Sequence, residues 1–491
     1  MKSKPATASP LRKKPSIERW QPHLPQKRGL KFLVEHGAAA LLFDPGLGKT
    51  STTYGAFEFL RKRKVARRML VVAPLRVAQL VWPAEAQKWA DFNHLKVGLL
   101  HGKNKDKVLA SAADYDVLVI NPEGLQWLIT GSQRGTVVDS KRWKALQCDT
   151  LVIDELTKFK HTKGVRFKVL KQVLGSFSRR WGLTGTPVPN GLLDLFGQMY
   201  VLDLGNALGK YITHYRMQYF INPDGQGWKW VLQSGAADKI YAKVKNLALR
   251  ANAADYLDLP QQVDLFHEVE LPAKVRKLYD DLEGYLWAKM GAKEITTANA
   301  AAVGIKLRQI ANGQVYVDDD MASKAFGKKR TVLELHEEKL NAVEELIEEL
   351  QGQPLLLAYE FNHDLDRLRD RFADVPYIGA GVNAKRAQQI EQDWNNGDIP
   401  LLLGHPASMG HGLNLQGCDA QHVGWFSMFW DFELYEQFIK RILRQGNKSK
   451  RVFNHHFVAK DTTDEDVRWA QKHKSRGQLA FLEAMGARRG R

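Results

Sequence analysis

Short runs of apolar residues recur along the first half of the chain and alternate with longer segments of mixed polarity. These runs cover residues 39–43, 69–73, 117–120, 151–153 and 181–183. Each run is apolar throughout and is bounded by turn-forming residues, which is typical of parallel strands buried on both faces by helices. The pattern therefore predicts a mainly parallel sheet with helices on either side.

A second series of apolar runs follows in the other half, at residues 355–358, 400–403, 422–426 and 452–458. Between the two series, Leu-Pro pairs flank a run of alternating polarity, residues 263–269. Because proline interrupts regular structure, these pairs indicate a connection between two folded units. The two series predict an α/β fold of two tandem lobes, each a mainly parallel sheet flanked by helices.

The boundary between the lobes is expected near residue 259. We predict a disordered basic tail at residues 1–19, a first lobe at 20–258, a second lobe at 259–470 and a basic C-terminal tail at 471–491. The first nineteen residues mix Lys and Arg with Pro, Ser and Ala, and this composition cannot bury a core.

Two further segments carry turn or loop composition. Residues 221–236, which contain Asn-Pro-Asp-Gly, predict a turn or a hairpin insertion. Residues 317–330 combine three consecutive aspartates with a Lys-Lys-Arg run and predict a mobile loop.

The first predicted strand runs into a glycine-containing loop and then into a helix-compatible segment. Gly46 and Gly48 leave backbone N–H groups free to curl around phosphate oxygens, and the helix N-terminus adds partial positive charge. Lys49 can reach the β and γ phosphates, and the Thr50 hydroxyl can hold Mg²⁺. This order of strand, loop and helix predicts an ATP-binding phosphate loop.

Two consecutive acids, Asp154 and Glu155, end the strand predicted at residues 151–153. An aspartate there can hold Mg²⁺, and the neighbouring glutamate can orient and deprotonate an attacking water. A strand that merely ends in a solvated acidic turn is the other interpretation. The phosphate loop about a hundred residues upstream favours the catalytic one.

Charge adds a class of ligand. The chain has 491 residues, with 72 Lys and Arg against 54 Asp and Glu, a formal net charge of +18. Such a balance is expected of proteins that bind the phosphate backbone of nucleic acids. A soluble protein with a basic surface would also carry it, so charge alone does not settle the matter.

Nothing in the sequence predicts a membrane or an oxidising environment. No apolar run approaches the ~18 residues of a membrane span, and the N-terminus lacks an apolar signal region. Cys148 and Cys418 are far apart in sequence, which disfavours a disulfide framework or a zinc cluster. We expect a reducing compartment: the cytoplasm of a bacterial or phage-infected cell, or the nucleus of a eukaryote.

Further segments lie at motif-like spacing around these sites. In the first lobe they contain Pro74 with Arg76, then Trp82, then Asn121, and then Thr184 within Leu-Thr-Gly-Thr-Pro. In the second lobe they lie at residues 410–415 and 437–446. These two segments contain Gly412, Asn414, Gln437, Arg441 and Arg444.

In order and spacing, these segments resemble superfamily-two DNA helicases and translocases, and specifically the Swi/Snf-like branch, over roughly residues 20–470. The resemblance implies two RecA-like lobes with ATP and Mg²⁺ in the cleft between them. It implies that Gln26 reads adenine, and that Arg441 and Arg444 are arginine fingers that stabilise γ-phosphate charge when the cleft closes.

The resemblance also implies which residues contact DNA. The same motifs in the family line the DNA track, and here they contain Pro74, Arg76, Asn121, Thr184, Gly412 and Asn414.

The chain departs from the family pattern at several positions. Phe43 stands where the strict phosphate loop has its first glycine, and Leu156 and Thr157 stand where Ala and His often follow Asp-Glu. Pro189 takes the place of a frequent Gln, and Phe432 that of a proline. These changes leave hydrolysis intact as an expectation but bear on how the site is coupled to DNA.

We therefore expect a monomeric, ATP-driven translocase that moves along DNA, largely without regard to sequence and on duplex. One alternative is a helicase that separates strands or migrates branches in replication, repair or recombination. Another is a basic DNA-binding scaffold that uses ATP as a conformational switch. RNA as the track is not excluded by the sequence.

Overall fold

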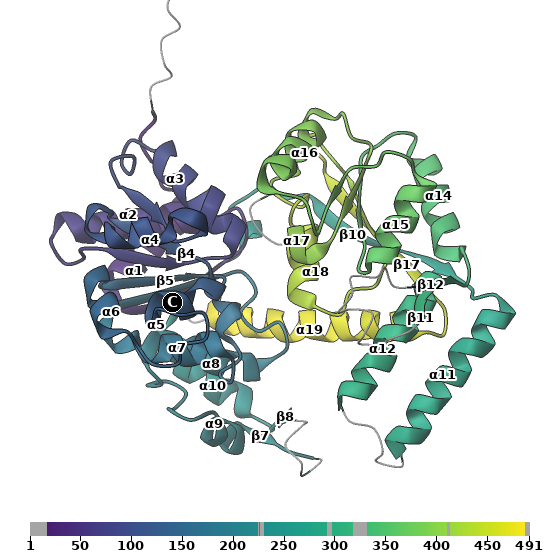
Figure 1. The fold of residues 1–491 in the computed structure, drawn as a ribbon, viewed down its shortest axis with the longest axis horizontal. Coiled ribbons are helices and arrows are strands. Elements are labelled where there is room, and N and C mark those ends of the chain that lie inside the picture. The colour runs from purple at the N-terminus through teal and green to yellow at the C-terminus, as the bar shows by residue number, and fades with distance from the viewer. Residues whose placement is uncertain are drawn as a thin grey trace, which may run out of the picture.

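The structure is a computed structural model. It describes residues 17–223, 225, 230–291, 297–317, 331–409 and 413–486. Two α/β bodies lie side by side, with the first half of the chain in one and the second half in the other (Figure 1). In the described part of the chain, no helix is both long enough and apolar enough to cross a membrane.

The first lobe is built on a seven-stranded sheet in the order β3-β4-β2-β5-β6-β1-β9. Every neighbouring pair in it is parallel. All five runs predicted as strands are confirmed within it. The strands are β1 (Ala38–Phe43), β2 (Met69–Val72), β3 (Val97–Leu99), β4 (Val117–Ile120), β5 (Thr150–Asp154), β6 (Arg179–Thr184) and β9 (Ala248–Ala251).

Helices cover both faces of this sheet. Leu41 of β1 lies in a core with residues of α1, α2 and α3, whereas the next residue, Leu42, lies in a separate core with residues of α5, α7 and α8. Successive side chains of a strand point to opposite faces, so a strand covered on both sides must be apolar at every position. The helices are α1 (Leu24–Glu35), α2 (Lys49–Lys62), α3 (Trp82–Lys88), α4 (Lys105–Ala110), α5 (Leu125–Thr130), α6 (Ser140–Leu146), α7 (Val165–Lys171), α8 (Leu195–Asp203), α9 (Ile212–Tyr219) and α10 (Ala236–Val244).

The second lobe is built on a six-stranded sheet in the order β10-β17-β16-β13-β15-β14, again parallel throughout. The four apolar runs of the second half form strands here, and the alternating run forms the edge strand β10. The strands are β10 (Gln261–Val269), β13 (Leu355–Ala358), β14 (Tyr377–Ile378), β15 (Leu401–Gly404), β16 (His422–Trp425) and β17 (Arg451–Ala459).

The two sheets are connected through residues 252–260, because β9 closes the first sheet and β10 opens the second. We propose that the lobes divide within this connection, near residue 259. The helices of the second lobe are α11 (Ala273–Gly291), α12 (Thr297–Asn312), α14 (Glu338–Leu350), α15 (Asn362–Arg371), α16 (Ala384–Asn396), α17 (Pro406–Met409), α18 (Phe432–Ile439) and α19 (Thr463–Gly486).

The C-terminal segment differs from the basic tail that the sequence suggested. Residues 471–486 continue the long helix α19, which runs back towards the first lobe and contacts β9 (Figure 1). Gln471 anchors it by donating from Nε2 to the Phe429 carbonyl at 2.7 Å. Its buried positions, Val467 and Gln471, are four residues apart and form a helical face that the high content of charged residues hides in the sequence.

The N-terminal boundary also shifts. Residues 1–16 lie outside the described residues, but residues 17–19 are not part of a detached tail. The Glu18 carbonyl accepts a hydrogen bond from the Ala90 N–H at 2.9 Å, and the Trp20 N–H donates to Asp91 Oδ2 at 2.8 Å. Ring packing of Trp20 on Phe92 explains why the chain is fixed so early.

Two antiparallel hairpins lie outside the two main sheets. One pairs β7 (Phe220–Ile221) with β8 (Val231–Leu232), so the hairpin interpretation of residues 221–236 holds for the strands, while part of its turn lies outside the described residues. The other pairs β11 (Gln314–Val317) with β12 (Thr331–Glu334). The loop predicted at residues 317–330 falls almost wholly outside the described part of the chain.

The fold generates one stability prediction. Lys339 Nζ lies 2.6 Å from Asp464 Oδ2 with both side chains fully buried, and it ties α14 to α19. Replacing Lys339 by Met would leave the carboxylate buried without its cation, so we expect Lys339→Met to lower the free energy of unfolding by about 3–5 kcal/mol.

Urea unfolding followed by tryptophan fluorescence measures this change. The matched control is Lys31→Met, because Lys31 pairs with Glu35 at 3.7 Å on the exposed face of α1 and should contribute less than about 1 kcal/mol. Equal shifts of the urea midpoint in the two variants would contradict the role given to the buried pair.

Candidate nucleotide and nucleic-acid site

The phosphate loop joins β1 to the N-terminus of α2. Gly46 and Gly48 have φ angles of +89° and +71°, a region that favours glycine. A Cβ on Gly48 would lie 2.0 Å from Gln26 Nε2, so a side chain there would displace the Gln26 carboxamide. The loop therefore has space and backbone geometry for an anion but not for additional side chains.

Lys49 is the first residue of α2, and its ammonium group folds back over the loop. Its Nζ donates to the Phe43 carbonyl at 2.8 Å and reaches the Asp44 carbonyl at 3.4 Å. Desolvation in the cleft lowers the pKa of Lys49, against the opposing charges of Glu155 and Asp154. Thr50 follows in the first turn of α2 and is half-buried. The cation is thus held at the loop with backbone dipoles as its partners.

The two acids that end β5 have different environments. Asp154 is buried and accepts a hydrogen bond from Trp82 Nε1 at 2.9 Å. Burial raises the pKa of the Asp154 carboxyl, and the Trp82 bond and Lys49 oppose that rise. Glu155 has a left-handed backbone, with φ 62°. Desolvation, followed by the charges of Asp154 and Glu433, raises the pKa of Glu155 to about 7.

The second lobe contributes two arginines to this cleft, from the segment that follows α18. Arg441 is buried, and it donates to the Gln437 and Leu413 carbonyls, each at 3.0 Å. Arg444 donates to Asn414 Oδ1 at 2.5 Å. Burial lowers the pKa of Arg441 to about 9 and also lowers the pKa of Arg444. Desolvation is thus the largest influence on the pKa of both guanidinium groups, against the nearby charge of Glu391.

Arg444 lies beside the phosphate loop of the other lobe. A Cβ built on Gly46 would lie 3.9 Å from Arg444 Nε. The charge of Arg444 is also one of the influences on the pKa of Lys49, and that of Glu155 on the pKa of Arg441. The structure thus brings together residues that are about 400 positions apart in sequence.

A carboxylate of the second lobe enters the first lobe just after the two acids. Thr157 Oγ1 donates to Glu433 Oε1 at 2.6 Å, and Lys160 Nζ lies 3.5 Å from Glu433 Oε2. Glu433 is buried at the start of α18, so both contacts are shielded from water. Sequence reasoning singled out Thr157 as a departure from the family pattern but did not identify Glu433 as its partner.

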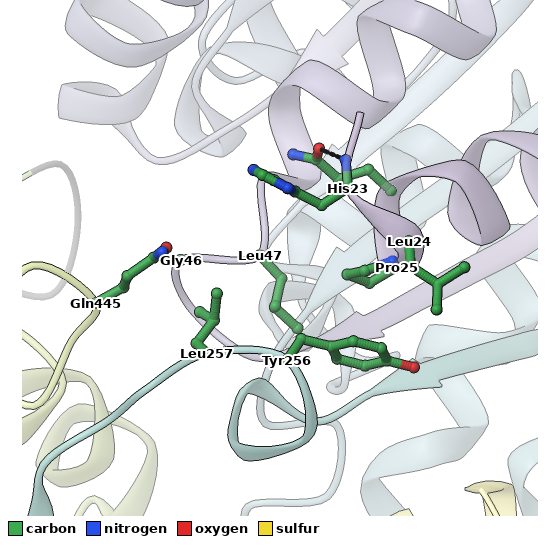
Figure 2. Close-up of a pocket in the computed structure, with 9 residues that line it drawn as sticks. His23, Leu24, Pro25, Gly46, Leu47, Tyr256, Leu257 and Gln445 are labelled. Atoms are coloured by element: carbon green, nitrogen blue, oxygen red, sulfur yellow. Dashed lines mark hydrogen bonds between the residues drawn. The ribbon is translucent and has the colours of Figure 1, made fainter. Parts of the chain in front are cut away.

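A pocket of about 240 Å³ opens next to the loop and is lined by α1, the phosphate loop and the connection after β9. In Figure 2, Gln445 extends from the second lobe towards Gly46, with Tyr256 and Leu257 on the side of the connection. Gln26 belongs to this lining; its Oε1 accepts from the His23 N–H at 2.8 Å. Apolar side chains together with the carboxamides of Gln26 and Gln445 suit a flat heterocycle that both donates and accepts.

The residues predicted to contact DNA are not all placed alike. Pro74 lies two residues after β2, and Asn121 directly follows β4, so both lie at the carboxyl ends of the strands, as the phosphate loop does. Arg76 donates from NH1 to the Ser408 carbonyl at 2.9 Å and so makes a second contact between the lobes. Asn414 is held by Arg444.

Thr184 and Trp82, from the segments predicted to contact DNA, are both buried. Thr184 is fully buried, and its hydroxyl accepts from the Thr186 N–H at 3.2 Å. Gly412 lies outside the described residues. Trp82, part of the first DNA-contacting segment by resemblance, is fully buried and holds Asp154 instead. In this conformation Thr184 and Trp82 therefore support the site from inside.

Histidine, cysteine and acidic side chains elsewhere in the chain do not form a metal site in the described residues. The described residues contain no group of three or more His, Cys, Asp or Glu side chains that could hold a metal ion. His455 and His456 lie in β17, where His455 is hydrogen-bonded to the rings of His267 and His422 at 2.9 and 3.0 Å. These imidazoles pack between strands and have a structural role.

Comparisons with known proteins identify the family to which the chain belongs. Residues 25–318 match the model of the SNF2-related domain, and residues 338–446 match that of the helicase conserved C-terminal domain. A putative protein p41 of Acyrthosiphon pisum secondary endosymbiont phage 1 is 37% identical over 454 residues, covering 90% of this chain and 93% of that protein.

More distant relatives are longer. An uncharacterized ATP-dependent helicase of Mycoplasma genitalium is 25% identical over 91% of this chain. A SWI/SNF-related matrix-associated actin-dependent regulator of chromatin subfamily A-like protein 1 of Xenopus tropicalis is 25% identical over 94% of it. The chain spans 41% of the first and 45% of the second.

Among solved structures, a Sulfolobus solfataricus SWI2/SNF2 ATPase core in complex with dsDNA is similar with a TM-score of 0.43 and 20% identity, over 96% of this chain and 98% of that one. The fold assignment rests on the two parallel sheets described above, and the family assignment on the domain matches and the phage relative. The chain belongs to the SNF2-related family of helicase-type ATP hydrolases.

Proposed function

We propose that this ATP hydrolase is a translocase that uses closure and opening of its two lobes to move along DNA, with duplex as the track. The observation that carries the proposal is the position of Arg444, which comes from the second lobe and lies against Gly46 of the phosphate loop. An ATP site that needs both lobes makes each turnover depend on their relative movement.

The cleft residues divide the chemistry among them. Lys49 would contact the β and γ phosphates, and Glu155 would orient water and accept its proton. Arg441 and Arg444 would stabilise charge that develops on the γ phosphate. We propose that Gln26 reads the adenine edge from the neighbouring pocket.

Magnesium fits the donors that the cleft provides. Mg²⁺ is commonly held by one or two protein oxygens together with substrate phosphates, and Thr50 and Asp154 supply a hydroxyl and a carboxylate for this purpose. When bound, the ion would neutralise phosphate charge. The hydrogen bond from Trp82 Nε1 holds the Asp154 carboxylate in one orientation.

The DNA track is proposed to run over the edge of the lobes that carries the remaining motifs. It would contact Pro74, Arg76, Asn121, Gly412 and Asn414, with Thr184 acting from beneath. Contacts to phosphates carry no sequence information, so binding should not depend on sequence. The net charge of +18 supports a polyanionic track.

The Arg76–Ser408 contact is how the track would sense closure. The Arg76 guanidinium reaches a carbonyl of α17 in the second lobe, at 2.9 Å. A residue that contacts DNA and also bridges the lobes would link occupancy of the track to closure of the ATP site.

The direct test measures hydrolysis and movement together. We expect duplex DNA to stimulate ATP turnover and the protein to displace a triplex-forming strand from duplex without separating the duplex itself. Glu155→Gln is the control, because the amide keeps the shape but cannot accept a proton, so it should bind ATP and fail in both assays.

Other outcomes would point to other functions. Separation of the duplex strands would favour a helicase, and stimulation by RNA alone would change the track. ATP binding without DNA-stimulated turnover in the wild type would favour the ATP-switched scaffold and would contradict the proposal.

The arginine fingers give a prediction of their own. Because Arg444 reaches the loop only across the cleft, it should act mainly in the transition state, and comparable fingers contribute roughly 10³–10⁵ in rate. We expect Arg444→Ala, and to a similar degree Arg441→Ala, to lower kcat by about this factor with a much smaller change in KM for ATP.

Steady-state kinetics with and without duplex DNA provide the measurement. Arg386→Ala is a matched control, since Arg386 is an exposed arginine of α16 in the same lobe. If Arg444→Ala behaves like Arg386→Ala in both conditions, the arginine has no part in hydrolysis.

The contact between Thr157 and Glu433 predicts a coupling between the lobes. If this buried bond helps to hold the closed arrangement, Thr157→Val and Glu433→Ala should each lower kcat, and the double variant should be little worse than Glu433→Ala. The interaction energy from the double-mutant cycle should lie at about 0.5–3 kcal/mol.

Thr157→Ser keeps the hydroxyl and should retain most of the activity. The cycle is measured from kcat for ATP at saturating duplex DNA. KM for ATP is measured on the same samples, because a general loss of folded protein would leave KM unchanged. Strictly additive losses would show that the two side chains act independently and that their contact does not contribute to closure.

A further inference from the structure

A groove of about 360 Å³ lies on the first lobe, formed by α7, the middle of α8 and the start of α9. It shares no lining residue with the nucleotide pocket. Four of its lining residues are lysines, Lys163, Lys168, Lys171 and Lys210, and no acidic side chain lines it. A concave surface with this charge is electrostatically complementary to a polyanion.

Aromatic rings form the rest of the groove. Phe167 and Phe196 are buried beneath it, and Tyr200 packs on them at ring-centroid distances of 5.6 and 6.2 Å. Lys171 Nζ lies 4.8 Å from the centre of the Tyr200 ring. At the rim, Tyr211 is 61% exposed although it is a large ring. An exposed tyrosine beside unneutralised lysines offers both a stacking surface and phosphate contacts.

We propose that this groove binds single-stranded nucleic acid. Proteins that hold single strands combine a positively charged groove for the backbone with aromatic rings on which unpaired bases stack. A base inside a duplex is already stacked on its neighbours and cannot present its face to Tyr211. An acidic peptide would satisfy the lysines but would leave the tyrosine without a flat partner.

The groove is close in sequence to the contact between the lobes. Its first lining residue, Thr162, follows Lys160 by two positions, and Lys160 pairs with Glu433 of the second lobe. Gly197 of α8 packs directly on the backbone of Phe159 and Lys160. A nucleic-acid strand held in the groove would therefore lie next to residues 157–160, the segment that contacts Glu433 of the second lobe. The inference rests on the proposed function only in that the ligand is a nucleic acid.

The test compares binding of a fluorescent oligo-dT, which has no secondary structure, to the full-length wild type and to two triple variants. The groove variant is Lys163→Ala/Lys168→Ala/Lys171→Ala. The control variant removes the same charge from exposed lysines that do not line the groove, at the end of α2 and just before β3: Lys62→Ala/Lys64→Ala/Lys96→Ala. Anisotropy is measured over a series of salt concentrations, with oligo-U, duplex DNA and poly-glutamate as competitors.

We expect the groove variant to bind oligo-dT more weakly and its log–log salt slope to fall by about 2, since each phosphate contact on a single strand contributes roughly 0.7. The control variant should change binding and slope much less. Tyr211→Ala should weaken binding at least about fivefold while Tyr211→Phe should not, because stacking needs the ring and not the hydroxyl. Oligo-U should compete as oligo-dT does if the groove accepts both nucleic acids, whereas competition by oligo-dT alone would restrict it to DNA.

Three results would overturn the proposal. Equal losses in the groove and control variants would mean that only total charge matters, and an unchanged Tyr211→Ala would remove the stacking site. If poly-glutamate displaces oligo-dT as effectively as oligo-U does, the groove would be assigned to an acidic protein. Duplex-stimulated ATP turnover is measured on the same samples, so a failure of the translocase proposal would be seen separately from a failure of the groove.

Discussion

Desolvation of charged side chains is the constraint on which the cleft depends. Lys49 donates to two backbone carbonyls, and Arg441 and Arg444 donate to carbonyls and one carboxamide. Desolvation lowers the pKa of all three, which means that the folded protein holds these cations at a cost. A triphosphate would add negative charge beside these cations, so binding of ATP and closure of the lobes should favour each other.

The contacts between the lobes follow from this arrangement. If closure were driven only by the bound nucleotide, any relative position that brought cations near phosphate would serve. Glu433 adds direction, because its carboxylate fits between Thr157 and Lys160 in one register. Arg76 adds a hydrogen bond to a backbone carbonyl of the second lobe, at the edge proposed for DNA. Through these two contacts, the same movement of the lobes would affect both the ATP site and the proposed DNA track.

Much of this could be predicted from the sequence, because parallel strands buried on both faces must be apolar at every position. β1 and β13 were found on that ground, whereas β14 has two residues and β9 contains an arginine, so neither shows the pattern. The phosphate loop and the acids of β5 are local motifs and were found with their strands. The pairing of Thr157 with Glu433 could not be predicted, since the two are 276 positions apart and meet only when the lobes are together.

We infer that ATP closes the two lobes on each other, and a distance across the cleft measures this closure. Spin labels at Val137→Cys in the first lobe and Lys385→Cys in the second occupy exposed positions, with Cys148 and Cys418 replaced by Ser and Glu155→Gln included to prevent hydrolysis. We expect double electron–electron resonance to show a broad distance distribution without ligand and a narrow one, at the separation in this structure, with ATP and duplex DNA. A distribution that ATP and DNA leave unchanged would contradict it.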